Sequence, residues 1–335
     1  MILEATEKLS QKINLCCEEM NAVMEEIMTG KCQTVQIVAF LEALSNKGET
    51  VDEITASARV MRSHAVQIKV DKEVILDTCG TGGDKKGTFN VSTITAFVVA
   101  GCGVTVAKHG NKAVSSSCGS ADILSALGIN IQVSKEIIQE CLEKIGIAFL
   151  FAPNMHPAMK HAMEARKQIG RRTIFNIMGP LCNPACATHQ LIGVFDQPLT
   201  ETVASVLGNL GTKHALVVHG KDGLDEITLS DKTFVCEWRN SRLDKYEIAP
   251  EDFGFRRVDM GELLGGNVHD NVQIMLEVLN GKPGNKRNMV LLNSAASLYA
   301  ADKVNSIKEG LSLAEESIDS GRALKKLALL KEYTR

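Results

Sequence analysis

A glycine-rich turn between a predicted strand and a predicted helix constrains the fold of this chain more than any other feature. The apolar run 74–76 leads into residues 77–84 (DTCGTGGD), and a helix-like run follows Asn90 as far as residue 100. Glycines at such a turn let backbone N–H groups approach an anion closely, and the first turn of a helix carries partial positive charge. The pattern therefore predicts a phosphate-binding loop in an α/β fold.

The two best-known phosphate motifs do not match this turn. A P-loop needs Gly-Lys-Ser/Thr, whereas the order here is Lys86-Gly87-Thr88. The dinucleotide fingerprint needs a third glycine where Lys85 stands. Taken alone, the turn is also compatible with a plain tight connection between strand and helix, so other parts of the chain have to decide.

Two kinds of pattern divide the chain. In the first 65 residues or so, apolar residues recur at helical spacing; they include a methionine-rich stripe over 20–28, which predicts either a helical core or a partner surface. From about residue 70, short β-like runs alternate with helices, which is typical of an α/β domain with a largely parallel sheet. The expected strands are 74–77, 103–107, 147–151, 190–195 and 215–219. The expected helices include 92–100, 119–127, 135–145, 199–210, 268–279, 289–299, 306–317 and 323–330.

Composition excludes several classes of protein. The net charge of −3 and the 4% aromatic content argue against a nucleic-acid-binding surface. We expect no membrane span, because no run of about 18 apolar residues occurs. The N-terminus lacks the pattern of a signal peptide, and the ten cysteines include no Cys-x-x-Cys pair. We therefore expect a cytoplasmic protein with reduced thiols and no zinc site.

A second polar loop follows the second expected strand. It contains Lys108 to Lys112 and then the serine-rich run 115–122. Ligands bind at the carboxyl ends of parallel strands, so this loop and the glycine-rich turn are expected at one edge of the sheet. Lys108 offers a charge for phosphate, and the serines offer hydroxyl donors. The alternative is that the serines only cap a helix and Lys108 is a surface charge.

Arginines and a pair of acids complete the set. Arg166, Arg171 and Arg172 lie beside an apolar segment, and a guanidinium group suits a planar carboxylate, although each could instead form a structural ion pair. Asp225 and Glu226 follow a strand end and would repel one another without a cation. Mg²⁺ takes one or two carboxylates together with substrate phosphates, and the alternative is two solvated acids in a turn. Together these elements suit a sugar diphosphate and an aromatic acid, with no covalent nucleophile required.

These motifs, in this order and spacing, resemble the anthranilate phosphoribosyltransferase family, which has the nucleoside phosphorylase and phosphoribosyltransferase fold. The resemblance runs from the first helices to near the C-terminus. One departure is Cys118, where the family often has serine. The matching segments are 80–84, 90–93, 108–111, 119–122, 156–158, 172–176, 179–181, 183–184 and 225–226.

The resemblance implies a small all-helical domain and a large α/β domain with a mainly parallel central sheet flanked by helices. The helical domain would be residues 1–68, joined by a returning segment near 160–185, and the catalytic domain 69–335. The implied reaction transfers the phosphoribosyl group of 5-phospho-α-D-ribose 1-diphosphate (PRPP) to anthranilate, with Mg²⁺, in tryptophan biosynthesis. The implied assembly is a homodimer formed through the helical domain.

The resemblance also implies roles for individual residues, and none of them is assigned as a catalytic group, with His109 only a candidate proton acceptor. Anthranilate would contact Gly80, Asn111 and Arg166, with His109 and His156 lining its entry. Mg²⁺ would be held by Ser92, Asp225 and Glu226. The expected PRPP contacts are Gly80, Gly83, Asp84, Thr88, Asn90, Val91, Ser92, Thr93, Lys108, His109, Gly110, Asn111, Lys112, Ala113, Val114, Ser115, Ser116 and Ser120.

Two alternatives accompany this interpretation. A pyrimidine nucleoside phosphorylase-like enzyme would share the fold, but its Lys-His-Ser signature is absent from the first loop. A non-enzymatic relative that binds nucleic acid would be expected to show a basic groove and eroded phosphate loops.

Overall fold

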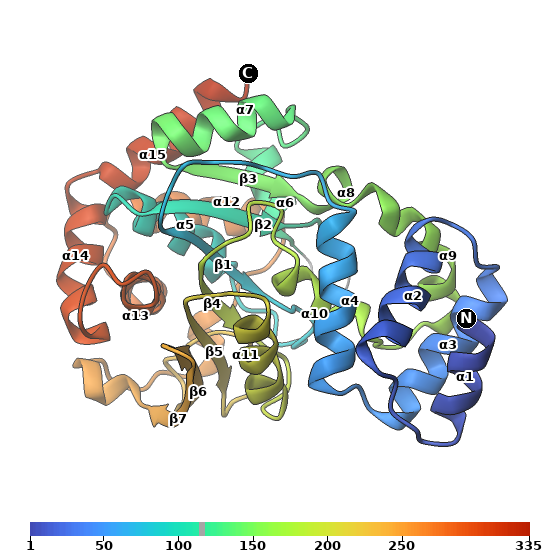
Figure 1. Ribbon diagram of the computed structural model, residues 1–335. Helices are drawn as coiled ribbons and strands as arrows, with labels where there is room; N and C mark the ends of the chain where they lie inside the picture. Colours follow the sequence, from blue (N-terminus) through green and yellow to red (C-terminus); the bar gives the residue numbers. More distant parts are fainter. Residues whose placement is uncertain (114–117) are drawn as a thin grey trace.

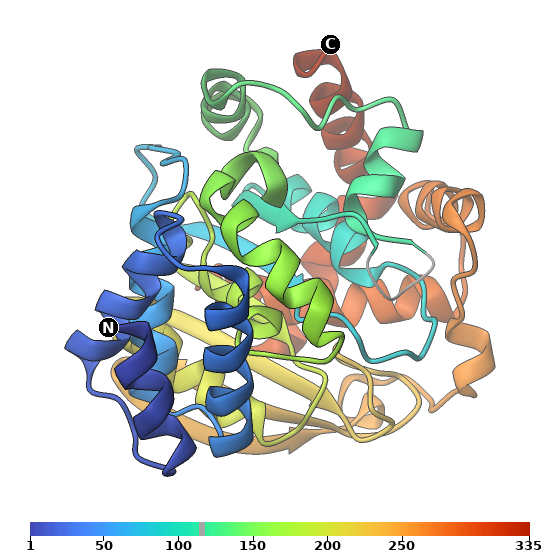
Figure 2. The ribbon, with the colours of Figure 1, turned by 90° about the vertical axis from the view of Figure 1, so that its right-hand side faces the viewer.

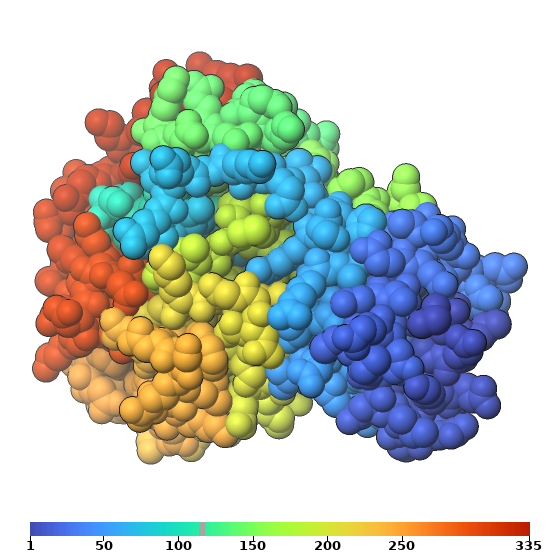
Figure 3. Space-filling model, viewed as in Figure 1, coloured from blue at the N-terminus to red at the C-terminus, as the bar shows by residue number. Residues whose placement is uncertain are grey.

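The computed structural model describes residues 1–113 and 118–335. A lobe of N-terminal helices lies at one side of a larger α/β part, and the space-filling view shows the two as separate bulges (Figures 1 and 3). This arrangement confirms the expected fold class. The lobe contains α1 (Ile2–Ser10), α2 (Cys17–Met28), α3 (Thr34–Lys47) and α4 (Val51–Ser63).

The methionine-rich stripe of α2 forms the core of this lobe. Met20, Val23 and Met24 are completely buried within the chain. The alternative of a partner surface is therefore wrong for these side chains. Helix α4 begins at a capping box, in which the Glu53 N–H donates to Thr50 Oγ1 over 3.2 Å and the Thr50 N–H donates to Glu53 Oε2 over 2.8 Å.

The larger part is built on one seven-stranded sheet of order β3-β2-β1-β4-β5-β6-β7. The first five strands in this order run parallel, and β6 and β7 continue the sheet antiparallel. The parallel strands correspond to the five expected ones, with ends shifted by up to three residues. The strands are β1 (Ile75–Gly80), β2 (Thr105–Gly110), β3 (Ile147–Phe151), β4 (His189–Gly193), β5 (His214–Gly220), β6 (Thr233–Arg239) and β7 (Arg242–Ile248).

The hairpin of β6 and β7 was not among the expected strands. Its turn residues Asn240 and Ser241 have φ values of 51° and 58°, as a two-residue turn between twisted antiparallel strands requires. Charged residues such as Glu237 and Lys245 interrupt the apolar pattern, because β7 is an edge strand and β6 carries polar contacts. Periodicity alone therefore did not indicate these strands.

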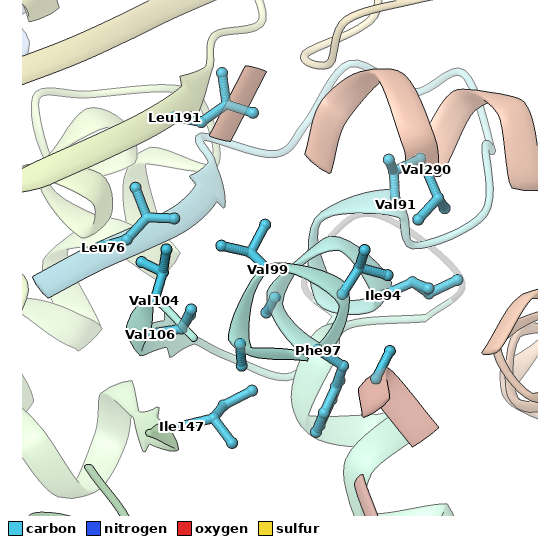
Figure 4. Close-up of a cluster of buried hydrophobic side chains, with 14 of the residues drawn as sticks. Leu76, Val91, Ile94, Phe97, Val99, Val104, Val106, Ile147, Leu191 and Val290 are labelled. Atoms are coloured by element: carbon cyan, nitrogen blue, oxygen red, sulfur yellow. The ribbon is translucent and has the colours of Figure 1, made fainter. Parts of the chain in front are cut away.

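Helices cover both faces of the sheet. On one face, α5 (Val91–Gly101) is surrounded by apolar side chains from the sheet and from the C-terminal helices, as Figure 4 shows for Leu76, Ile147 and Val290. The remaining helices are α6 (Ser120–Ala126), α7 (Lys135–Glu140) with a π-helical turn (Cys141–Ile145), α8 (Ala152–Met155), α9 (Lys160–Ile169), α10 (Phe175–Leu181), α11 (Leu199–Asn209), α12 (Val268–Leu279), α13 (Asn285–Ala300), α14 (Ile307–Asp319) and α15 (Arg322–Tyr333). Short 3-10 turns lie at Pro157–Met159, Pro250–Phe253 and Met260–Leu263.

Helix α9 lies with the helical lobe although the sequence separates the two. It packs against α3 and α2, and Figure 2 shows it beside the N-terminal helices. The apolar side chains of the lobe continue into those under the other face of the sheet, including Ile192 and Val217. Among the described residues, no helix is both long and apolar enough to cross a membrane.

Candidate active site

Glycines end four of the parallel strands on the same edge of the sheet. These are Gly80 of β1, Gly110 of β2, Gly193 of β4 and Gly220 of β5, and Gly80 pairs directly with Gly193. The chain order along the sheet changes direction between β1 and β4. In α/β sheets, ligands bind outside the carboxyl ends of the strands at such a switch point. The topology therefore indicates a binding crevice where the glycine-rich turn begins.

The glycine-rich turn crosses from β1 to β4 and reaches the acidic pair. The Thr81 N–H donates to the Gly193 carbonyl over 2.9 Å, and Thr81 Oγ1 accepts the Phe195 N–H over 3.1 Å. The Gly82 N–H donates to Asp225 Oδ2 over 2.8 Å. The structure thus brings together the glycine-rich turn and the acidic pair that the sequence singled out.

Gly193 allows this contact by having no side chain. The position that its Cβ would take is filled by the backbone carbonyl oxygen of Asp225. A Cβ on Gly80 would lie 2.6 Å from Asp225 Oδ2. The sequence analysis did not single out Gly193. Its position at the end of a buried strand was the one sequence feature that could have indicated its importance.

Burial and neighbouring negative charge raise the pKa values of Asp225 and Glu226 in the crevice. Burial raises the pKa of Asp225 to about 7, and the nearby charge of Asp84 adds to that effect. Burial, followed by the charge of Asp225, raises the pKa of Glu226 well above its ordinary value. Asp84 Oδ2 is buried and has no hydrogen-bond partner. Such a site disfavours the ionised carboxylates unless a cation accompanies them.

These residues fit a Mg²⁺ ion that is completed by its substrate. Within residues 1–113 and 118–335, no three His, Cys, Asp or Glu side chains form a ready-made metal-binding group. Mg²⁺ does not need one, because it usually takes one or two carboxylates plus water and phosphate oxygens. Ser92 lies beside the pair. Its backbone hydrogen-bonds Glu226, which opposes only a small part of the rise in the pKa of that carboxyl, and its Oγ accepts a 3.3 Å hydrogen bond from Lys108. The donor set is therefore hard oxygen throughout.

Lys108 lies beneath the crevice, with only 4% of its surface exposed. Its Nζ donates to the Thr78 carbonyl as well as to Ser92. Asp77, completely buried on β1, accepts the His109 N–H over 3.1 Å and the Asn183 Nδ2 over 2.7 Å. Burial raises the pKa of Asp77. A surface role for Lys108 is therefore wrong. Asp77 and Asn183 lie in segments that the sequence analysis quoted without giving either residue a role, and here they make structural contacts.

The start of α5 is held by a cap. The Thr93 N–H donates to Asn90 Oδ1 over 3.2 Å, and the Asn90 N–H donates to Asn271 Oδ1 over 2.9 Å. The side chains of Val91 and Thr93 are completely buried, and the Thr93 hydroxyl has no partner. Thr88, just before, forms an isolated bridge with Leu264.

Asp122 closes the second loop. Its Oδ2 accepts the Ala113 N–H over 2.9 Å and the Gly119 N–H over 3.0 Å. Ser120 Oγ donates to the Asn111 carbonyl over 3.3 Å. Lys112, like Asn111, is exposed, and its N–H donates to Asn111 Oδ1 over 2.8 Å. The expected contacts Val114, Ser115 and Ser116 lie outside the described residues.

Two buried histidines face each other beside these loops. The ring centroids of His109 and His156 are 5.0 Å apart, and His109 Nδ1 hydrogen-bonds the Gly179 carbonyl over 3.0 Å. The Nε2 atom of each ring is buried without a partner. Burial lowers the pKa of His109 to about 3 and that of His156 to about 4. Both imidazoles are therefore neutral near pH 7.

The three arginines occupy different places. Arg171 lies 3.7 Å from Glu42 and hydrogen-bonds Asn46, within the helical lobe. Arg172 stacks on the ring of Phe195, and its guanidinium also contacts the glycine-rich turn.

Of the three arginines, only Arg166 has no side-chain hydrogen-bond or ion-pair partner among the described residues. It is half-buried on α9, with its guanidinium carbon 5.6 Å from the Phe175 ring. Burial lowers its pKa, and no carboxylate among the described residues contributes to that shift.

Family models cover nearly all of the chain. Residues 3–65 match the helical bundle domain of a glycosyl transferase family, and residues 72–324 match the a/b domain of the same family. These two matches correspond to the lobe and to the sheet-containing part.

Individual relatives agree with the family models. The anthranilate phosphoribosyltransferase of Methanobrevibacter smithii is 53% identical over 334 residues, covering 100% of this chain and 99% of the relative. The enzyme of that name from Petrotoga mobilis is 51% identical, covering 98% of this chain and 95% of the relative.

Solved structures agree as well. A crystal structure of anthranilate phosphoribosyltransferase from Thermus thermophilus superimposes with a TM-score of 0.94 at 40% identity, over 99% of each chain. The Saccharomyces cerevisiae enzyme in complex with PRPP and Mg gives a TM-score of 0.92 at 29% identity, over 99% of this chain and 97% of that one. The chain belongs to the anthranilate phosphoribosyltransferase family.

Proposed function

We propose that this protein transfers the 5-phosphoribosyl group of PRPP to the amino group of anthranilate, releasing diphosphate, in the crevice at the β1–β4 switch point. Membership of the family supports the reaction, which belongs to tryptophan biosynthesis. The observation that carries the location is the hydrogen bond from Gly82 to Asp225, which joins two loops 143 residues apart in the chain.

The glycine-rich turn and the second loop would bind the donor. Backbone N–H groups of the turn, at Gly80, Gly83 and Asp84, would stabilise the negative charge that grows on the departing diphosphate. Lys108 lies next to Ser92 and would add positive charge close to the bound diphosphate. The remaining residues expected from the sequence would also contact PRPP. Because the side chains of Val91 and Thr93 are buried, these two residues would contribute through their backbone at the start of α5.

Ser92, Asp225 and Glu226 would hold Mg²⁺. When bound, the ion supplies positive charge that favours departure of the diphosphate. The raised pKa of Asp225 supports this assignment, because a carboxylate that is costly to ionise alone is stabilised by a cation. A related structure, the yeast enzyme, was solved in complex with PRPP and Mg.

Arg166 would bind the carboxylate of anthranilate, with Asn111 and Gly80 nearby. Its guanidinium is half-buried beside an aromatic ring and has no carboxylate partner among the described residues. The carboxylate of a planar acid could therefore form a two-hydrogen-bond pair with it. His109 and His156 would line the entry as neutral rings. The amino group of anthranilate is uncharged near pH 7, so its lone pair can attack without a strong base.

We further propose a cytoplasmic homodimer formed through the helical lobe. The core stripes of the lobe are used within the chain, but Leu3 on α1 and Val35 on α3 are 65% and 66% exposed. Light scattering tests this: the native protein should have twice the mass of one chain, and Leu3→Glu with Val35→Glu should halve it.

A fluorescence assay that follows the loss of anthranilate tests the reaction directly. Conversion should require both PRPP and Mg²⁺, and its absence under all conditions would overturn the proposal. Offering a nucleoside with inorganic phosphate tests the phosphorylase alternative, and filter binding with DNA tests the non-enzymatic one.

A further inference from the structure

Arg172 connects three segments that are distant in the sequence. It follows α9, which packs in the helical lobe. Its guanidinium carbon lies 3.7 Å from the ring centroid of Phe195, in the segment after β4. One of its N–H groups donates to the carbonyl oxygen of Gly83 in the glycine-rich turn. No other side chain among the described residues donates a hydrogen bond to that carbonyl.

The contact with Gly83 determines the orientation of one peptide unit. Gly82 and Gly83 have φ values of 65° and 81°, in the region that glycine adopts freely, so the backbone here resists rotation less than elsewhere. In a trans peptide, the carbonyl of Gly83 and the N–H of Asp84 point in opposite directions. Whatever holds the Gly83 oxygen therefore also directs the Asp84 N–H.

This orientation matters for a loop that binds an anion. A peptide that turns its N–H toward a diphosphate attracts it, whereas the flipped peptide would present a carbonyl oxygen and repel it. The opposite side of the same turn is fixed by the Gly82 N–H on Asp225. Without Arg172, the Gly83 carbonyl would have no hydrogen-bond donor among the described residues to fix its direction.

We propose that Arg172 is a positioning residue for the donor: it holds the Gly83–Asp84 peptide with its N–H available to the diphosphate, and Phe195 holds the guanidinium flat. This inference rests on the proposed function. Arg172 differs from Arg166 in that Gly83 and Phe195 already fix the orientation of its guanidinium, although further N–H groups of Arg172 remain.

The test compares neighbouring arginines. Arg172→Ala should raise the KM for PRPP, and the inhibition constant of Mg²⁺-diphosphate, by about tenfold, the effect of losing one charge-assisted hydrogen bond. The KM for anthranilate should stay within about twofold of the native value. Arg171→Ala is the matched control, because the polar contacts of Arg171 within residues 1–113 and 118–335 are with Glu42 and Asn46 of the helical lobe, and it should change none of these constants.

Two further variants separate positioning from folding. Arg172→Lys should recover part of the PRPP affinity, because an ammonium group can donate to the carbonyl but has no planar face for the ring. Phe195→Leu keeps Arg172 and should give a smaller rise in the same constant. Thermal melting of each variant shows whether the fold is intact.

The inference would be wrong if Arg172→Ala matched Arg171→Ala in its donor constants, or if it raised the KM for anthranilate instead. A failure of the proposed function can be told apart from a failure of this inference, because in the first case the native protein itself would not convert anthranilate. In that event, calorimetric titration with Mg²⁺-diphosphate still compares Arg172→Ala with the native chain. A tenfold weaker titration would support the positioning role, and an equal one would refute it.

Discussion

The imidazole rings of His109 and His156 pack 5.0 Å apart, and the Nε2 atom of each is buried without a hydrogen-bond partner. Burial lowers their pKa values to about 3 and about 4. Two protonated rings at this distance would repel one another, and each would lose its hydration. Burial therefore favours the neutral form of both rings.

This pair predicts a loss of stability in acid. A histidine whose pKa is lowered on folding destabilises the folded state as the pH falls from the unfolded value of about 6.5 toward the folded one. The melting temperature should fall between pH 6.5 and 4, and His109→Gln with His156→Gln should reduce that slope. Imidazole NMR signals assigned to His109 and His156 that titrate near pH 6.5 in the folded protein would contradict the prediction.

Asp225 predicts a pH-dependent response to Mg²⁺. Its pKa of about 7 exceeds its unfolded value, so its contribution to stability is present at low pH and is lost as the pH rises from about 4 to 7. Bound Mg²⁺ should restore that stability. The ion with PRPP should therefore raise the melting temperature more at pH 8 than at pH 6.

Asp225→Asn supplies the matching variant. It should melt higher than the native protein at pH 8 without metal, because no charge is buried, and it should lose Mg²⁺-dependent turnover. A normal response to Mg²⁺ in Asp225→Asn would show that the metal lies elsewhere.

Arg166 predicts a selective loss of acceptor binding. Arg166→Ala should raise the KM for anthranilate by roughly 10- to 100-fold, since a charge-assisted hydrogen bond contributes about 1.5–3 kcal/mol. The KM for PRPP should change little. Lys167→Ala, one position along the exposed side of α9, is the control. Unchanged kinetics in Arg166→Ala would remove this residue from the site.

Gly193 predicts a loss of activity through backbone displacement. In Gly193→Ala, the new Cβ would overlap the Asp225 carbonyl oxygen, so the acidic loop would have to move away from β4. We expect a folded protein, by circular dichroism, whose turnover falls by at least about tenfold and responds only weakly to Mg²⁺. Native turnover in this variant would mean that the loop tolerates the shift.

A cluster on the opposite edge of the sheet predicts an effect on stability alone. His214 is completely buried, with Nε2 at 2.9 Å from Glu237 and Nδ1 at 3.0 Å from Asp302. His214→Gln should destabilise the fold by roughly 1–3 kcal/mol, because a buried hydrogen-bonding ring that joins Glu237 to Asp302 is lost. Denaturant unfolding measures this, and both KM values should stay native. Altered KM values would contradict the prediction, because they would show that His214 also affects substrate binding at the opposite edge of the sheet.

Local patterns predicted much of the secondary structure. The expected strand at 147–151 and the helix at 268–279 match β3 and α12 residue for residue. The first is a short apolar run, and the second begins at a cap formed by Asn267 and Asp270. Interactions of this kind extend over a few residues, so they can be recognised in the sequence.

Other features depended on distant contacts. The hairpin of β6 and β7 carries charged residues that local periodicity does not explain. The three arginines look alike in the sequence, yet Arg166 is left without an acidic partner among the described residues, Arg171 joins the helical lobe and Arg172 holds the glycine-rich turn. Gly193 looks like any strand-ending glycine until the carbonyl of Asp225 is seen in its Cβ position.

The amino-acid sequence by itself determined the strands and helices, the glycine-rich turn and the polar loops at one edge of a parallel sheet, because these follow from spacing, capping and strand direction. Only the tertiary structure decided which loops touch. The Gly82 N–H meets Asp225 because the sheet order places β1 beside β4 and β4 beside β5, an arrangement set by packing across the whole domain. That packing also buried Lys108, His109 and His156, and burial is the physical reason why the two imidazoles are neutral near pH 7.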